Sequence, residues 1–250
     1  MRIHKSPEKI IGESSHGVNV NKMIDMKVPL NYLKTEGACL TPNGAKFKND
    51  SQGFLPEMME KMYNERVVFK KRMIKAKIEY EKTKDPKLVK EIARCHNIQW
   101  SKKIALNSAY GAVGNQYFRY YDVRQASGIT TAGQFIIRFI ESKVNEYLNR
   151  ILQTHDKIDY IVASDTDSIY VTLDKLVEKT CEGKTNDQIC NFIDKVVGSR
   201  IEPFLEKCFG ELSDYTNAFK NCMVMKREVI ADKGIWVAKK RYMLNVLDEE

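Results

Sequence analysis

The sequence predicts an α+β fold, in which an antiparallel sheet with packed helices carries an inserted antiparallel helical hairpin. Two long helical stretches that meet at Asp85-Pro86 indicate the hairpin, because proline disfavours helix at the residue before it. Apolar residues at helical spacing between 135 and 151, followed by two apolar runs around 164–168, indicate the domain that carries the hairpin.

The two long helices have recognisable starts and ends. Residues 53–56 open the first helix, since proline is tolerated in a first turn, and the helix is expected to run to about Lys82. The second helix is expected from about Leu88 to Tyr110, with a stop near Gly111 and Gly114-Asn115.

Shorter elements are expected on both sides of the hairpin. The stretch 32–48 reads as two extended pieces joined at 41–44, where an Asn-Gly pair favours a tight turn. Two strands are expected on either side of 164–168. Further along, the pattern predicts a helix over 187–209 and strands over 223–229 and 241–246.

Composition favours a polyanionic partner and a reducing compartment. The net charge is +8, from 41 Lys and Arg against 33 Asp and Glu, and such a surplus favours binding to phosphates. Six scattered cysteines without a C-x-x-C pair argue against a disulfide framework and a zinc site. No apolar run is long enough for a membrane span, and the first residues do not read as a secretory signal, so a cytoplasmic location is expected.

The hairpin can gather cations on one patch. Arg66 and Lys70 share a face of the first helix, and Lys103 and Asn107 share a face of the second, with Tyr110 one turn further on. Antiparallel pairing places the two sets at the same height, and such a patch suits a polyphosphate. The spacing alone also fits an ordinary solvated face of a basic helix.

A pair of carboxylates lies between the two predicted strands of the central region. Asp165 and Asp167 are two residues apart, so in extended chain their side chains would project to the same side. Hard divalent cations such as Mg²⁺ prefer such oxygen ligands, although Asp and Ser are also common in plain turns. Together with the basic patch, the pair suggests two-metal phosphoryl transfer.

Three ordered motifs carry a resemblance to a known family. Residues 103–111 match the pattern K-x-x-x-N-S-x-Y-G, residues 164–168 match the end of Y-G-D-T-D-S, and residues 239–242 match K-K-R-Y. The set resembles DNA polymerase family B, and the chain looks closest to the replicative polymerases of T-even-type bacteriophages. Stretches that support this closeness are 118–122, 143–149 and 226–230.

The resemblance implies a role for each matching residue. The triphosphate of an incoming deoxynucleotide would be held by Arg66, Lys70, Lys103 and Asn107. Tyr110 would lie beneath the nascent base pair, and Gly111 would let the template strand approach closely.

The resemblance also implies a metal site and a grip on DNA. Asp167 would ligate two Mg²⁺ ions with support from Asp165, and Glu228 would lie behind them. The primer-template would be gripped by Lys239, Lys240, Arg241 and Tyr242.

The resemblance divides the chain into palm and fingers. Residues 1–52 and 116–250 would be parts of the palm, and 53–115 would be the fingers. The first palm motif of the family, which carries a further metal ligand, is expected just before residue 1. The chain is therefore expected to be a fragment or one subunit of a split polymerase, and to be inactive on its own. A sliding clamp would bind through regions outside this chain.

Two departures and two alternatives accompany this interpretation. Ser164 stands where the family carries glycine, and Lys226 stands where the phage relatives carry an acid, which affects the surroundings of Glu228.

A non-catalytic nucleic-acid-binding module would use the basic hairpin alone and gains nothing from Asp165 and Asp167. Reverse transcriptases usually carry adjacent aspartates and lack the 103–111 motif.

Overall fold

The computed structural model describes residues 5–154 and 158–249, so residues 1–4, 155–157 and 250 of the expected palm segments lie outside the described chain. The elements are, in order, a 3₁₀ turn Pro7–Lys9, β1 Ile10–Glu13, α1 Val20–Ile24, α2 Tyr32–Glu36, β2 Ala38–Leu40, β3 Ala45–Lys48, α3 Phe54–Thr83, α4 Pro86–Val113, α5 Val123–Leu152, β4 Ile161–Asp165, β5 Ser168–Val171, α6 Asp174–Thr180, α7 Asn186–Val196, a π-helical segment Val197–Ile201, α8 Glu202–Tyr215, β6 Val229–Ala238 and β7 Arg241–Glu249. The predicted mixture of helices and small antiparallel sheets is confirmed.

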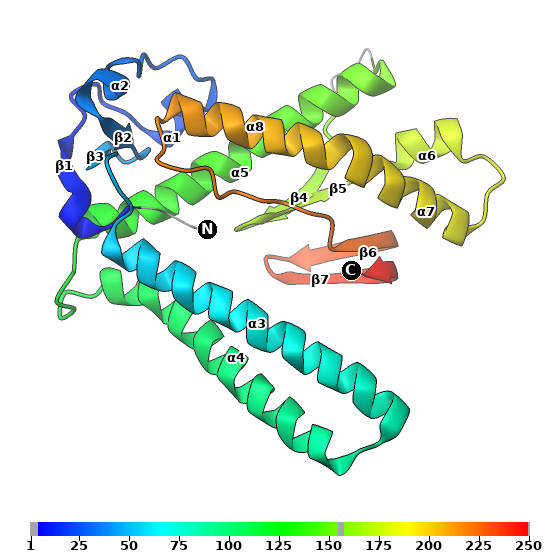
Figure 1. Cartoon of the computed structure of the whole chain (residues 1–250). Helices are drawn as coiled ribbons and strands as arrows, with labels where there is room; N and C mark the ends of the chain where they lie inside the picture. The colour runs from blue at the N-terminus through cyan, green and yellow to red at the C-terminus, as the bar shows by residue number, and fades with distance from the viewer. Residues whose placement is uncertain (1–4, 155–157, 250) are drawn as a thin grey trace.

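The predicted helical hairpin is present and projects from the rest of the molecule (Figure 1). Lys84 ends α3 in a left-handed conformation, and the Asp85 side chain then accepts a hydrogen bond from the Lys87 backbone N–H, with Pro86 in the first turn of α4. Of the expected stop signals near Gly111 and Gly114-Asn115, the second ends α4. The helix continues through Gly111 to Val113, with Gly114 at its C-cap, because a glycine inside a helix lowers its stability without breaking it.

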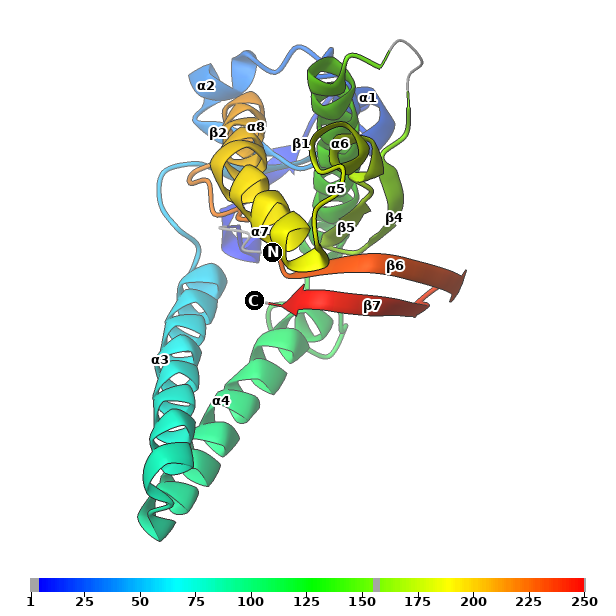
Figure 2. The ribbon, with the colours of Figure 1, turned by 90° about the vertical axis from the view of Figure 1, so that its right-hand side faces the viewer.

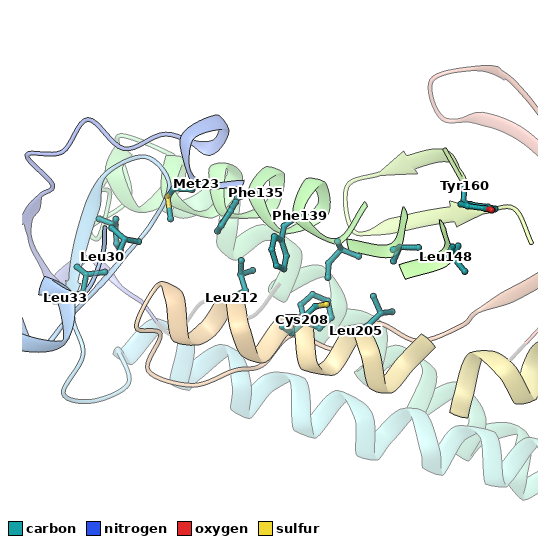
Figure 3. Close-up of a cluster of buried hydrophobic side chains, with 14 of the residues drawn as sticks. Met23, Leu30, Leu33, Phe135, Phe139, Leu148, Tyr160, Leu205, Cys208 and Leu212 are labelled. Atoms are coloured by element: carbon teal, nitrogen blue, oxygen red, sulfur yellow. The ribbon is translucent and has the colours of Figure 1, made fainter. Parts of the chain in front are cut away.

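The main core lies between α5 and α8, which run along each other (Figure 3). Asp122 caps the start of α5 by accepting from the Arg124 backbone N–H. The apolar stripe of α5 then faces α8, and α1 and α2 close the end of the cluster. The buried residues that α5 and α8 contribute to this core include Phe135, Phe139, Val144, Leu148, Leu205, Cys208, Phe209 and Leu212.

Cys208 gives a direct test of this packing. Burial in the cluster raises the pKa of its thiol to about 11, and only 2% of the residue is exposed. Because the thiolate is the nucleophile, only about one thiol in a thousand would be ionised at pH 8. We expect Cys208 to resist iodoacetamide in the folded chain and to react readily in guanidinium, as read by peptide mass spectrometry. Equal rates in the two conditions would contradict the packing of α8 on α5.

A small three-stranded sheet, in the order β1-β3-β2, lies at the start of the chain. The predicted turn at 41–44 joins β2 and β3, with Gly44 at φ 90° and the Thr41 N–H donating to the Ala45 carbonyl oxygen. However, Tyr32–Glu36 is a helix and not an extended piece. Gly37 ends it in a left-handed conformation and donates to the carbonyls of Leu33 and Lys34, a common helix stop.

Two later expectations also need correction. The single helix expected over 187–209 is divided by the π-helical segment Val197–Ile201. Pro203 follows at once in the first turn of α8, and its missing N–H cannot complete the preceding α-helical bonds, which accounts for the widened turn. The expected strand over 223–229 is wrong for all but its last residue, since β6 spans Val229–Ala238.

The β4–β5 hairpin lies beside the β6–β7 hairpin (Figures 1 and 2). The two hairpins form separate two-stranded sheets. Side chains and not backbone hydrogen bonds therefore hold them together.

Candidate active site

One large cleft, about 1960 Å³ in volume, lies between the helical hairpin and the two β-hairpins. Seven of the predicted site residues line it: Arg66, Lys103, Asn107, Tyr110, Asp167, Glu228 and Tyr242. Six others do not contribute to its wall, namely Lys70, Gly111, Asp165, Lys239, Lys240 and Arg241. The cleft therefore brings cations from both long helices and one of the paired carboxylates around a single space.

The cationic wall is formed by α3 and α4. The Nε of Arg66 is buried and has no hydrogen-bond partner among the described residues, so this donor is unsatisfied. Lys70 lies one turn further from the cleft and is exposed to solvent. Arg66, Lys70 and Lys103 take part in none of the ion pairs found between described side chains.

Acidic neighbours on the hairpin are already paired. Glu65 bonds to Lys102 of the facing helix, and this hydrogen bond lowers the pKa of the Glu65 carboxyl. The next residue, Lys103, instead places its ammonium 5.2 Å from the centre of the Trp100 ring, a cation–π contact. Among the described residues, no carboxylate pairs with Lys103, which lines the cleft.

The carboxylate turn differs from the extended arrangement that the sequence suggested. Asp165 ends β4, whereas Asp167 lies in the turn itself and is exposed on the cleft wall. Thr166 between them has φ 55°, which turns the chain sharply, so the rule for alternate residues of a strand does not apply. The Thr166 hydroxyl donates to Oδ1 of Asp165 at 2.9 Å.

The rest of this turn is also tightly bonded. The Ser168 hydroxyl donates to the backbone oxygen of Asp165 at 3.1 Å, and Asp165 pairs with Ser168 across the hairpin. Ser164 lies in β4 opposite Ile169 and is exposed, so this strand position accepts a side chain in place of the family's glycine.

The donor set of the turn fits Mg²⁺ as far as this chain supplies it. Asp167 lies on the cleft wall and Asp165 is its neighbour in the turn, and carboxylates are ligands that Mg²⁺ usually takes from a protein, with the remainder from water and substrate phosphates. Across 5–154 and 158–249, no cluster of three or more His, Cys, Asp or Glu side chains could hold a metal ion by itself. Substrate oxygens or further ligands would have to complete the coordination of an ion at Asp167.

The β6–β7 hairpin forms another part of the cleft wall. Lys239 and Lys240 make its turn, with Lys240 at φ 62°, and Arg241 begins β7, all three exposed outside the cleft wall. Tyr242 lines the cleft and contacts the ring of Tyr170 from β5 and that of Trp236 from β6.

The two residues before Glu228 in the chain, Lys226 and Arg227, take different positions around it. Lys226 and Glu228 both line the cleft and are exposed, and neither pairs with the other in the described structure. Arg227 between them points elsewhere, to Asp194 of α7 at 2.9 Å and to Asp248 of β7 at 2.6 Å. Arg227 thereby ties the β6–β7 hairpin to α7.

Sequence reasoning missed Trp100, Tyr170, Trp236 and Arg227. Each lies near a predicted motif. The contacts of Tyr170, Trp236 and Arg227 join elements that are distant in the chain. The contact of Trp100 with Lys103 is local but requires a rotamer that no motif specifies. A tryptophan one turn before Lys103 was the only local signal available.

Comparison with known proteins decides the family. The family model described as DNA polymerase family B matches residues 6–249. This chain belongs to DNA polymerase family B. The predicted resemblance to phage members of the family is confirmed by two curated relatives, and none of the described helices is long and apolar enough to cross a membrane.

Relatives of this family B chain include two phage enzymes named DNA-directed DNA polymerase. That of Escherichia phage RB69 is 45% identical over 162 residues, which are 61% of this chain and 18% of the relative. That of Enterobacteria phage T4 is 34% identical over 258 residues, 97% of this chain and 26% of the relative. The chain thus spans about a quarter or less of the length of these relatives.

Among solved structures, the family B DNA polymerase from the archaeon Pyrobaculum calidifontis matches the whole chain and 24% of its own length. The sequence identity is 19% and the TM-score is 0.46, too low to argue a shared arrangement of elements.

Proposed function

We propose that this family B chain forms the nucleotide-binding cleft of a DNA-directed DNA polymerase. The enzyme would transfer a deoxynucleotide from its triphosphate to the 3′ end of a primer paired with a template, during phage DNA replication in the host cytoplasm. The observation that carries the proposal is the single cleft lined by Arg66, Lys103 and Asn107 on one side and Asp167 on the other. A binding protein without catalysis has no use for an acid facing the phosphates.

The helical hairpin would act as the fingers, 53–115, and bind the triphosphate. Arg66 has an unpartnered buried Nε and a planar guanidinium that can donate two parallel hydrogen bonds to phosphate oxygens. Lys103 adds a point charge, and Asn107 an amide donor, from the facing helix. Lys70, outside the cleft wall, would reach the terminal phosphate only if the hairpin rotates toward the palm.

The remaining segments, 1–52 and 116–250, would act as the palm. Asp167 and Asp165 would hold Mg²⁺, which supplies charge neutralisation at the phosphates and a lowered pKa for an attacking hydroxyl. Glu228, which lines the same cleft, would act near that site without binding the metal directly.

The nucleic acid would lie across the mouth of the cleft. Tyr110, on the last turns of α4, presents a half-exposed ring under the new base pair, and Gly111 beside it adds no side chain where the template passes. The exposed turn of β6–β7 would contact backbone phosphates of the primer-template through Lys239, Lys240 and Arg241, with Tyr242 behind it.

Primer extension tests the proposal. The polymerase that carries this sequence is given a labelled primer-template, Mg²⁺ and one deoxynucleotide at a time. We expect the primer to grow only with the nucleotide that complements the template, and only until Mg²⁺ is chelated. Tight DNA binding without extension would instead support a non-catalytic binding module.

A further inference from the structure

Three aromatic rings connect the carboxylate turn to the basic turn. Tyr170 of β5 contacts Trp236 of β6 and Tyr242 of β7 edge-to-face, each at 5.3 Å between ring centres. Trp236 and Tyr242 stack at 6.2 Å, so each ring touches the other two. We call these residues the aromatic cluster. It bridges two hairpins that share no sheet.

Gly234 leaves the space that the Trp236 indole occupies. A Cβ at Gly234 would lie 2.7 Å from the indole ring and 2.8 Å from Leu244, so the missing side chain makes room for the ring. The indole Nε1 is buried and has no hydrogen-bond partner among the described residues. Ring packing and not a hydrogen bond therefore fixes Trp236.

Each end of the aromatic cluster is close to a proposed ligand site. Tyr170 lies three residues after Asp167 on a four-residue strand, and Ser168 on that strand bonds to the backbone of Asp165. Tyr242 lies two residues after Lys240, whose positive φ makes the basic turn. A shift of either turn would therefore move Tyr170 or Tyr242 against the other two rings of the aromatic cluster.

We propose that the aromatic cluster couples DNA binding at the β6–β7 turn to Mg²⁺ binding at the carboxylate turn, with Trp236 as a positioning residue. This rests on the proposed function. By linkage, DNA that fixes Tyr242 favours the arrangement of Tyr170 that presents Asp165 and Asp167 to the metal, and the metal strengthens DNA binding by the same factor.

Fluorescence can read this coupling without measuring activity. These 250 residues contain two tryptophans, so Trp100→Phe leaves Trp236 as their only indole. Its emission is recorded while Mg²⁺ is titrated with and without a short primer-template. We expect primer-template to lower the half-saturating Mg²⁺ concentration by roughly fivefold, at the lower end of usual allosteric couplings.

Variants of the cluster isolate its part. Tyr170→Ala, in the Trp100→Phe background, should reduce the coupling to less than twofold, whereas Tyr170→Phe keeps the ring and should retain most of it. Val237→Ala is the matched control, because Val237 neighbours Trp236 on β6 and is 66% exposed. Thermal melting followed by circular dichroism checks that each variant is folded.

The outcomes separate the two proposals. Full coupling in folded Tyr170→Ala would overturn the role of the aromatic cluster, and loss of coupling in Val237→Ala would show that any change in β6 suffices. If the Mg²⁺ response of the parent persists in Asp167→Asn, the metal site itself is wrong and the proposed function fails. If the parent shows no Mg²⁺ response, Trp236 does not sense the metal and the coupling is contradicted, whereas the proposed function is judged by primer extension.

Discussion

Replacing Asp167 by asparagine is expected to abolish primer extension by the polymerase that carries this sequence, while primer-template affinity changes less than about twofold. The substitution keeps the size of the side chain but removes the charge that would hold Mg²⁺ at the cleft wall. A metal ion contributes several kcal/mol to stabilising the transition state, and a loss of about 4 kcal/mol is roughly a thousandfold in rate. Single-turnover extension and filter binding measure the two effects separately.

Asp174→Asn is the matched control for this experiment. Asp174 is also exposed and lines the same cleft, at the start of α6, but it lies outside the carboxylate turn. Extension should stay within about threefold of the parent. If Asp167→Asn instead weakens DNA binding and leaves the chemical step unchanged, Asp167 has a structural role and the metal site is misplaced.

Replacing Lys103 by alanine is expected to cost about 2–3 kcal/mol in kcat/KM for the incoming nucleotide, the range of a charge-assisted contact. Lys103 lines the cleft, and no carboxylate of the described residues neutralises it. The loss would appear mainly in KM if the contact forms in the ground state, and in kcat if it strengthens as charge develops on the leaving phosphates.

Lys90→Ala serves as the control for Lys103→Ala. Lys90 is an exposed lysine of the same helix, nearer to the tip of the hairpin and outside the cleft wall. The Lys90→Ala substitution removes one positive charge from α4, as Lys103→Ala does, so any general effect of charge on DNA affinity appears in both variants. Steady-state constants that are equal in the two variants would remove Lys103 from the nucleotide site.

Local signals predicted the elements that carry the site. Asp85-Pro86 both ends α3 and starts α4, and the chain around 164–168 forms its hairpin by short-range bonds between neighbouring residues. The core helix α5 was equally visible, because its apolar stripe is long and regular.

Two features that sequence reasoning missed have different causes. The conformation of Thr166 follows from closing a short hairpin and not from residue type. The aromatic cluster forms only when two separate hairpins meet, so tertiary packing sets it.

The arrangement of the cleft is tested most directly by an experimental structure with primer-template, Mg²⁺ and a non-hydrolysable deoxynucleoside triphosphate. The account predicts triphosphate oxygens within hydrogen-bond distance of Lys103 Nζ and the Arg66 guanidinium, with a metal ion between that triphosphate and the Asp167 carboxylate. A triphosphate bound away from α3 and α4, or an Asp167 carboxylate that contacts no metal, would contradict it.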